Sequence, residues 1–185
     1  MKKLICAALV LLLVSSCALA ESFSIRDGIT WSTTLEELTL LFPDTEPEET
    51  DFSNLQQYFF SNVSVAGTTG DFMASYLGDR LLMVGYIFEN ADRSALSAAL
   101  SEKYASAADC TKESFLELVN TVNGLSGAEE YDISSLDNYE ISCWAAAENT
   151  AIYLLTVDGD TIIEYFNMNA IEELSAAPVY TTDGL

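Results

Sequence analysis

Histidine is absent from this 185-residue chain. The absence excludes Ser-His-Asp and Cys-His nucleophile systems, which need imidazole as the base, and zinc sites with histidine ligands. An enzyme built on carboxylates alone is not excluded. We expect no catalytic, cofactor-binding or metal-binding residues, because the sequence contains no other motif for such chemistry.

Basic residues are also scarce, with 7 Lys and Arg against 29 Asp and Glu, which gives a net charge of −22. Lys2 and Lys3 belong to an apolar leader without acids, so the remaining chain has 5 basic and 29 acidic residues and carries −24. Such a field repels nucleic acid and anionic lipid headgroups. We therefore expect neutral, cationic or apolar partners and no nucleic acid.

Long apolar runs are limited to the N-terminus. Lys2 and Lys3 precede an apolar stretch over residues 4–14, which is too short to span a bilayer comfortably and is typical of a signal peptide. No later stretch of about 18 residues is apolar throughout, so no second span is expected. The sequence predicts a signal peptide over residues 1–20 and a single exported domain over residues 21–185.

Two processing routes fit the end of this leader. Ala18-Leu19-Ala20 is an A-x-A cleavage site that would release a soluble chain beginning at Glu21. Val14-Ser15-Ser16-Cys17 resembles a bacterial lipobox, in which Cys17 is lipidated. We favour secretion through the A-x-A site and keep the lipid anchor through Cys17 as the alternative, in which case the protein would be membrane-attached.

Only two of the four cysteines, Cys110 and Cys143, lie beyond the leader. In an oxidising compartment they could form a disulfide, and closing that loop would stabilise the fold by about 3–4 kcal/mol. Two separate buried thiols are the equal alternative.

Apolar spacing predicts four helices. The first begins near Thr33, where Glu36 completes a capping box, and ends before Pro43. The others are expected after Asp92, after Thr111 with Gly124 just beyond its end, and over residues 169–176.

Six segments have strand character: 57–66, 72–77, 81–88, 140–148, 151–157 and 161–166. Phe59, Val63 and Val65 should share one side of the first segment. Two hairpins, each followed by helical sequence, are consistent with a duplication. The predicted fold is α+β: an antiparallel sheet of hairpins with helices packed on one face, and with two hairpin–helix halves as an option.

Other candidate sites have simpler explanations. The acidic segment 44–51 offers oxygen ligands for calcium but lacks EF-hand spacing, so we expect a solvated loop. We likewise expect the larger aromatic side chains to pack in the core rather than line a binding groove: Trp31, Tyr58, Tyr86, Trp144, Tyr153 and Tyr165.

The segment GITWSTTLEELTLLFP over residues 28–43 resembles the opening of small secreted or lipid-anchored bacterial domains. Lys103-Tyr104 and a late hairpin containing Trp144 and Tyr165 extend the resemblance, although Ser32 stands where the pattern has glycine. These domains are similar in layout to outer-membrane assembly lipoproteins and β-lactamase-inhibitor-like folds. The resemblance implies protein binding rather than catalysis and carries over no functional residue.

The sequence therefore favours an exported bacterial protein that binds another protein or an envelope component outside the cytoplasm, without enzymatic activity or cofactor. We expect the faces of its hairpins to form the binding surface. The alternative function is a carboxylate-dependent hydrolase of extracellular glycan, which would need two acids facing each other in a cleft.

Overall fold

A computed structural model describes residues 24–26, 28–65, 67–108, 110–128, 140–157 and 159–176. The predicted leader, both processing sites and Cys17 lie outside these ranges. The elements in chain order are α2 (Leu35–Leu41), β1 (Glu48–Phe52), β2 (Leu55–Val65), β3 (Thr68–Leu77), β4 (Arg80–Glu89), α3 (Arg93–Lys103), β5 (Ala105–Ser106), α4 (Lys112–Ser126), β6 (Glu140–Ala146), β7 (Thr150–Val157), β8 (Asp160–Asn167) and α5 (Met168–Ala176).

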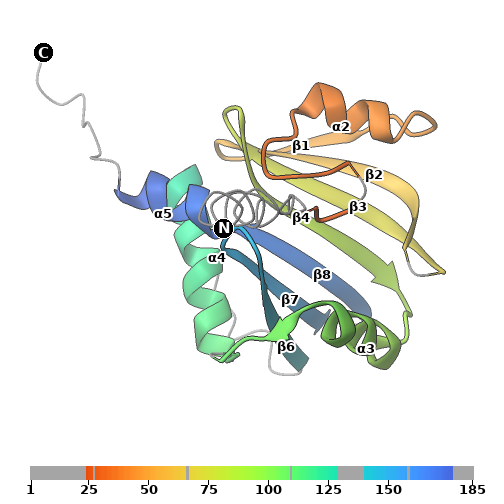
Figure 1. Cartoon of the computed structure of the whole chain (residues 1–185). Coiled ribbons are helices and arrows are strands. Elements are labelled where there is room, and N and C mark those ends of the chain that lie inside the picture. The colour runs from red at the N-terminus through yellow and green to blue at the C-terminus, as the bar shows by residue number, and fades with distance from the viewer. Residues whose placement is uncertain are drawn as a thin grey trace, which may run out of the picture.

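The described strands form one antiparallel sheet in the order β1-β2-β3-β4-β8-β7-β6-β5 (Figure 1). Both predicted hairpins, β3–β4 and β7–β8, are present, and they meet where β4 pairs with β8 along Met83–Glu89. The predicted α+β class with an antiparallel sheet is therefore confirmed.

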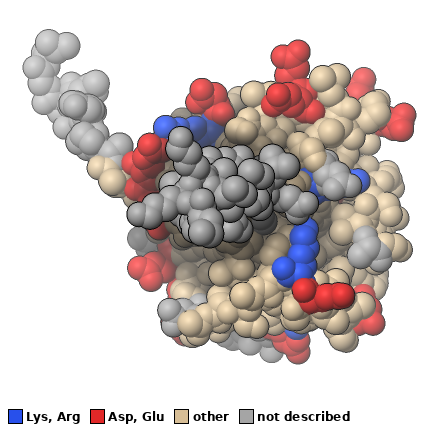
Figure 2. Space-filling model, in the orientation of Figure 1, with Lys and Arg blue, Asp and Glu red and all other residues tan. Residues whose placement is uncertain are grey.

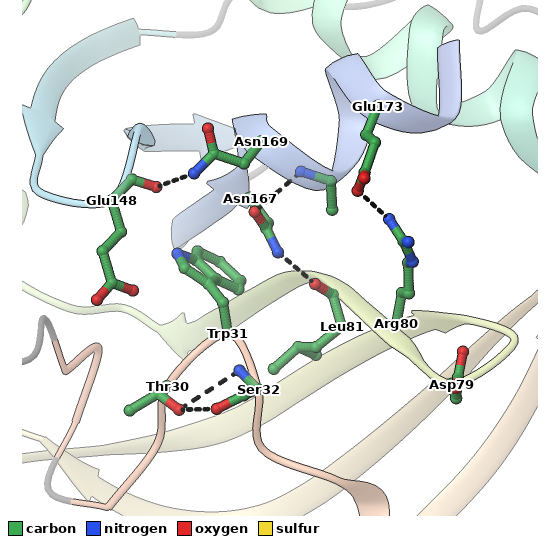
Figure 3. Close-up of a pocket in the computed structure, with 11 residues that line it drawn as sticks. Thr30, Trp31, Ser32, Asp79, Arg80, Leu81, Glu148, Asn167, Asn169 and Glu173 are labelled. Atoms are coloured by element: carbon green, nitrogen blue, oxygen red, sulfur yellow. Dashed lines mark hydrogen bonds and ion pairs between the residues drawn. The ribbon is translucent and has the colours of Figure 1, made fainter. Parts of the chain in front are cut away.

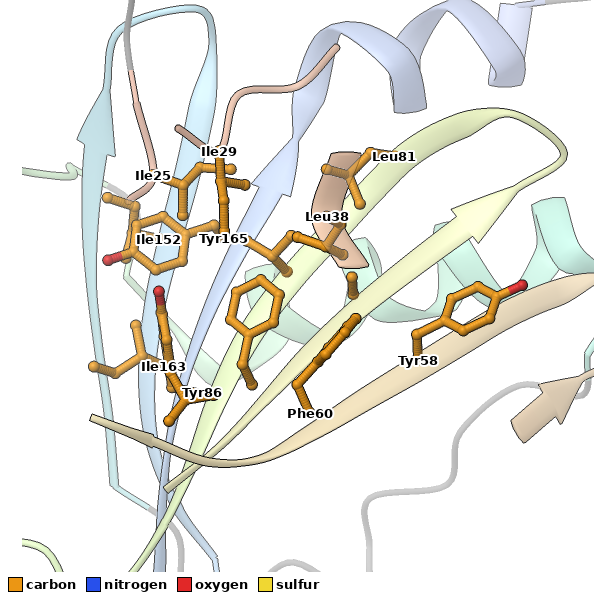
Figure 4. Close-up of a cluster of buried hydrophobic side chains, with 14 of the residues drawn as sticks. Ile25, Ile29, Leu38, Tyr58, Phe60, Leu81, Tyr86, Ile152, Ile163 and Tyr165 are labelled. Carbon is orange, nitrogen blue, oxygen red and sulfur yellow. The ribbon is translucent and has the colours of Figure 1, made fainter. Parts of the chain in front are cut away.

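The helices cover both faces of this sheet. Alternate strand residues enter two separate apolar clusters, so that Phe72 lies in the cluster with α2 and α3, and Met73 lies in the cluster with α4 and α5. Figure 4 shows part of the first cluster, with Leu38 of α2 above the aromatic side chains of the sheet. We call the two sides the α2/α3 face and the α4/α5 face.

The expectation that helices pack on one face only is wrong. The central strands carry apolar residues at successive positions, as in residues 81–84, and a strand that is apolar on both sides needs cover on both sides. The helices that follow the two hairpins, α3 and α5, also lie on opposite faces, so the hairpin–helix halves do not repeat one arrangement. The predicted binding surface on the hairpin faces is largely occupied by these clusters.

The first helix begins one residue later than predicted. Thr34, not Thr33, is the N-cap, and its capping box is completed by Glu37. Thr33 is instead buried, and its Oγ1 accepts the Thr30 N–H at 2.9 Å. The acidic segment that was expected to be a loop forms the edge strand β1 from Glu48 onward, paired with β2.

The end of α4 and the register of β2 also differ from the expectation. Helix α4 passes through Gly124 and ends at Gly127, whose φ of 76° is the left-handed conformation of a helix C-cap. Part of the loop expected over 125–138 is therefore helical, and residues 129–138 lie outside the described ranges. A register shift between Phe60 and Val63 also places Phe59 on the α4/α5 face, opposite to Val63.

The remaining helix starts follow the sequence prediction. Asp92 caps α3 and Thr111 caps α4, each accepting hydrogen bonds from the first helical turn. Among the described residues, none of the helices combines the length and apolar character needed to cross a membrane.

Candidate functional site

A pocket of about 710 Å³ lies at one end of the sheet, where three turns meet the start of α5 (Figure 3). Its size falls within the range of about 300–1,000 Å³ that is usual for ligand sites. The turns are those around Trp31, between β3 and β4, and between β6 and β7. The lining residues are Thr30, Trp31, Ser32, Asp79, Arg80, Leu81, Glu148, Asn167, Asn169, Ala170 and Glu173.

Trp31 forms one wall of this pocket, which we call the Trp31 pocket. Its Nε1 donates a hydrogen bond of 2.8 Å to Oγ1 of Thr150, a buried residue at the start of β7. The indole is half-buried against the α2/α3 cluster, and the hydroxyls of Thr30 and Ser32 lie 3.0 Å apart beside it. The ring is therefore held in place while part of it lines the pocket, instead of being fully enclosed in the core.

Asn167 and Asn169, where β8 passes into α5, also line the pocket. The buried Asn167 side chain donates to the Leu81 carbonyl at 3.0 Å and accepts from the Ala170 N–H at 3.1 Å. Asn169 donates to the Glu148 carbonyl at 3.2 Å. These bonds tie α5 to β4 and to the β6–β7 turn, so the walls are organised before any ligand arrives.

The charged groups of the pocket are mostly acidic. Asp79, Glu148 and Glu173 line it, and Arg80 is the cation among the described lining residues. Arg80 is ion-paired with Glu173 across the rim, as Figure 3 shows. Two carboxylates thus remain without a cation in the pocket.

The surroundings extend this negative field. Figure 2 shows acidic side chains spread around the visible face and basic ones at only a few places. With a chain charge of −22, the long-range potential attracts cations.

A second hollow of about 280 Å³ lies between α3 and the α2/α3 face of the sheet. Tyr86, Tyr104 and Tyr165 line it, together with Lys103, whose Nζ lies 5.0 Å from the centre of the Tyr104 ring. Burial raises the pKa of Tyr86 to about 12. Tyr86 and Tyr165 belong to the buried cluster, as predicted for core aromatic residues.

The arrangement needed for glycan hydrolysis is not found around the carboxyl that burial perturbs most. Glu164 on β8 has its pKa raised to about 7 because it is buried, which is the property required of a general acid. It lines a separate cavity under α4, and no second carboxyl is among the described residues that line that cavity.

The remaining candidate residues form neither a disulfide nor a metal site within the described residues. Cys110 and Cys143 are not joined by a disulfide; the first is half-buried and the second buried, and both belong to the α4/α5 cluster. In the part of the chain that the structure describes, no three acidic or cysteine side chains come together as metal ligands. Glu48 and Glu49 of the acidic segment lie along β1.

Sequence reasoning missed Asn167, Arg80 and Glu164. Asn167 had a usable signal, because an Asn between a strand and an amphipathic helix is typical of an N-cap. Glu164 also had one, as a charged residue within the apolar strand TIIEYF. Comparison of the chain with protein-family models, with curated proteins and with solved structures finds no match.

Proposed function

We propose that this protein is an exported, non-enzymatic binding domain that receives a lysine or arginine side chain of a partner protein in the Trp31 pocket. The observation that carries the proposal is the combination of a fixed indole with carboxylates that outnumber the cations around it. The partner would be a protein of the cell envelope or the surrounding medium.

Physical chemistry favours this ligand class. The aliphatic stem of a basic side chain packs on the indole, and its cation gains from the ring's electron-rich face. Glu148 lines the same pocket, and its carboxylate supplies the opposite charge. The net charge of the chain adds electrostatic steering toward a basic surface, which raises the association rate more than the final affinity.

A matched set of peptides tests this assignment. Blocked peptides with a central lysine or arginine are compared with the norleucine peptide by fluorescence anisotropy at low salt. We expect the basic peptides to bind, and Glu148→Gln to weaken their binding about two- to fivefold, a typical effect of one exposed charge. Trp31→Leu should weaken binding as well.

Glu102→Gln is the control variant, since it removes the same charge from the exposed surface of α3, away from the pocket. Equal binding of the norleucine peptide, or equal losses in the Glu102 and Glu148 variants, would show that the pocket does not recognise a basic side chain.

Export is tested independently by the intact mass of the protein recovered from outside the cytoplasm. We expect a chain that begins at Glu21, or a lipidated Cys17 if the alternative route is used. Recovery of the chain only from the cytoplasm with Met1 retained would refute export while leaving the peptide result intact.

A further inference from the structure

Glu164 is a carboxyl within a row of largely apolar side chains at the centre of the sheet. On the α4/α5 face it lies opposite Gly85 of β4 on one side and Tyr153 of β7 on the other. Met73 and Cys143 are the next members of that row. A carboxyl in this row would ordinarily need a partner, because an unpaired buried charge is costly.

The Glu164 carboxyl borders a cavity. A cavity of about 170 Å³ lies between the sheet and α4, and its lining is mostly apolar: Leu55, Gln57, Met83, Val119, Val122, Asn123, Glu164 and Phe166. Gly85 lies beside this carboxyl, and a Cβ there would lie 3.0 Å from the Ile163 carbonyl oxygen and 3.3 Å from the Met73 Cε. The volume is similar to that of a cavity of about 150 Å³ that holds a benzene-sized molecule.

The described residues provide this carboxyl with no hydrogen-bond partner. Its Oε2 is buried and makes no hydrogen bond within the described part of the chain. The nearby polar side chains are uncharged, and the Gln57 amide is already engaged with Ser75 Oγ at 3.3 Å. The carboxyl is therefore available to an incoming hydrogen-bond donor.

The titratable groups that face Glu164 leave its charge uncompensated. Tyr153 faces it from β7, and Cys143 lies beyond Tyr153 on β6; neither is a cation. The residues that β2, β4 and α4 contribute to the cavity lining are all uncharged. An ionised Glu164 thus lacks a counter-charge among the described residues that surround it.

We propose that this cavity binds a small primary alkylammonium ion, with the ammonium group on Glu164 and the alkyl chain against Val119 and Val122. The ammonium supplies both the counter-charge and the hydrogen-bond donors that the carboxylate lacks. The alkyl chain gains apolar contacts with Val119 and Val122 in the cavity lining. This site is on the other side of the sheet from the α2/α3 cluster that supports Trp31, and it does not depend on the function proposed for that pocket.

Titration of the purified protein with n-butylammonium chloride by isothermal calorimetry tests the proposal. The ion binds only ionised Glu164, whose pKa is about 7. We therefore expect the affinity to fall about tenfold per pH unit below 7 and to level off above it. Binding near pH 6 should also release a proton, seen as a heat that varies with the ionisation enthalpy of amine-free buffers.

Three variants separate the site from general charge effects. Glu164→Gln should abolish binding, and Val119→Phe, which fills the cavity but keeps the carboxyl, should abolish it too. Glu117→Gln removes a charge from the exposed side of the same helix and should bind as the parent does. If Glu164→Gln does not fold, Val119→Phe still decides the question.

The neutral analogue 1-butanol and a blocked lysine amide complete the set. The proposal is overturned if n-butylammonium binds no more tightly than 1-butanol, or if Glu164→Gln binds it unchanged. It is also overturned if only the blocked lysine binds, because the site would then recognise a peptide side chain rather than a free amine.

Discussion

The side chain of Asn167 hydrogen-bonds to the main-chain carbonyl of Leu81 at 3.0 Å, across the junction where β8 meets β4. Its Oδ1 also accepts the Ala170 N–H at 3.1 Å, which satisfies a donor in the first turn of α5. One buried amide thus connects the two hairpins, starts the last helix and supports a wall of the Trp31 pocket.

Replacing Asn167 by alanine should lower the free energy of unfolding by about 2–3 kcal/mol. Loss of the helix cap accounts for about 1 kcal/mol, and the buried Leu81 carbonyl is left without its partner. Urea unfolding followed by circular dichroism measures the change. Asn169→Ala is the exposed control and should stay within about 0.5 kcal/mol of the parent; equal effects of the two variants would contradict this role of Asn167.

Replacing each of the two glycines near the end of α4 by alanine should change the stability of the protein in opposite directions. Gly124→Ala should stabilise the protein by about 0.5–1 kcal/mol, because Gly124 is an exposed helical residue and an added Cβ meets nothing within 4 Å. Gly127→Ala should destabilise it by about 1 kcal/mol, since φ is 76° there and an L-residue rarely adopts that conformation. Urea midpoints of both variants, measured together, test the pair.

If α4 ended at Gly124, as the sequence suggested, Gly124→Ala would destabilise the protein instead. The pair therefore tests the helix boundary itself as well as the conformations of the two glycines.

Glu164 should make stability depend on pH between about 4.5 and 7. Burial raises its pKa in the folded protein to about 7, above the ordinary value of 4.5, so the folded state keeps a proton that the unfolded chain has lost. Below pH 4.5 the contribution of Glu164 to the free energy of unfolding is at its maximum. As the pH rises through 7 the free energy of unfolding falls by about 3 kcal/mol in total. Urea unfolding at several pH values in amine-free buffer measures the slope.

Glu164→Gln should remove most of this slope and be the more stable protein at pH 8. Glu117→Gln should retain it. A Glu164→Gln variant whose stability falls with pH as steeply as that of the parent would show that other groups cause the dependence.

Local sequence patterns predicted most of the helices and strands, and two of the wrong predictions can be explained from particular residues. The first capping box was misplaced by one residue because Thr33 and Thr34 each have a glutamate three residues later. Tertiary structure distinguishes them: Thr33 is buried, and its carbonyl accepts the Tyr76 hydroxyl at 3.1 Å. The acidic strand β1 was missed because its residues favour loops, whereas the edge of β2 offers them hydrogen-bond partners.

The candidate sites were less accessible to prediction. Trp31 was expected in the core, and its sequence neighbours do not indicate that Asn167, Glu148 and Arg80 would come to the same pocket. Those residues lie more than forty positions from Trp31 and reach it only because three turns and the start of α5 meet at one end of the sheet.

The sequence by itself determined the antiparallel hairpins, three of the helix starts and the acidic surface, because alternation, caps and charge act between neighbouring residues. Only the tertiary structure decided that β4 pairs with β8 and that two helices cover each face. These choices depend on how two distant apolar surfaces fit together, and local patterns encode the presence of such surfaces but not their partners.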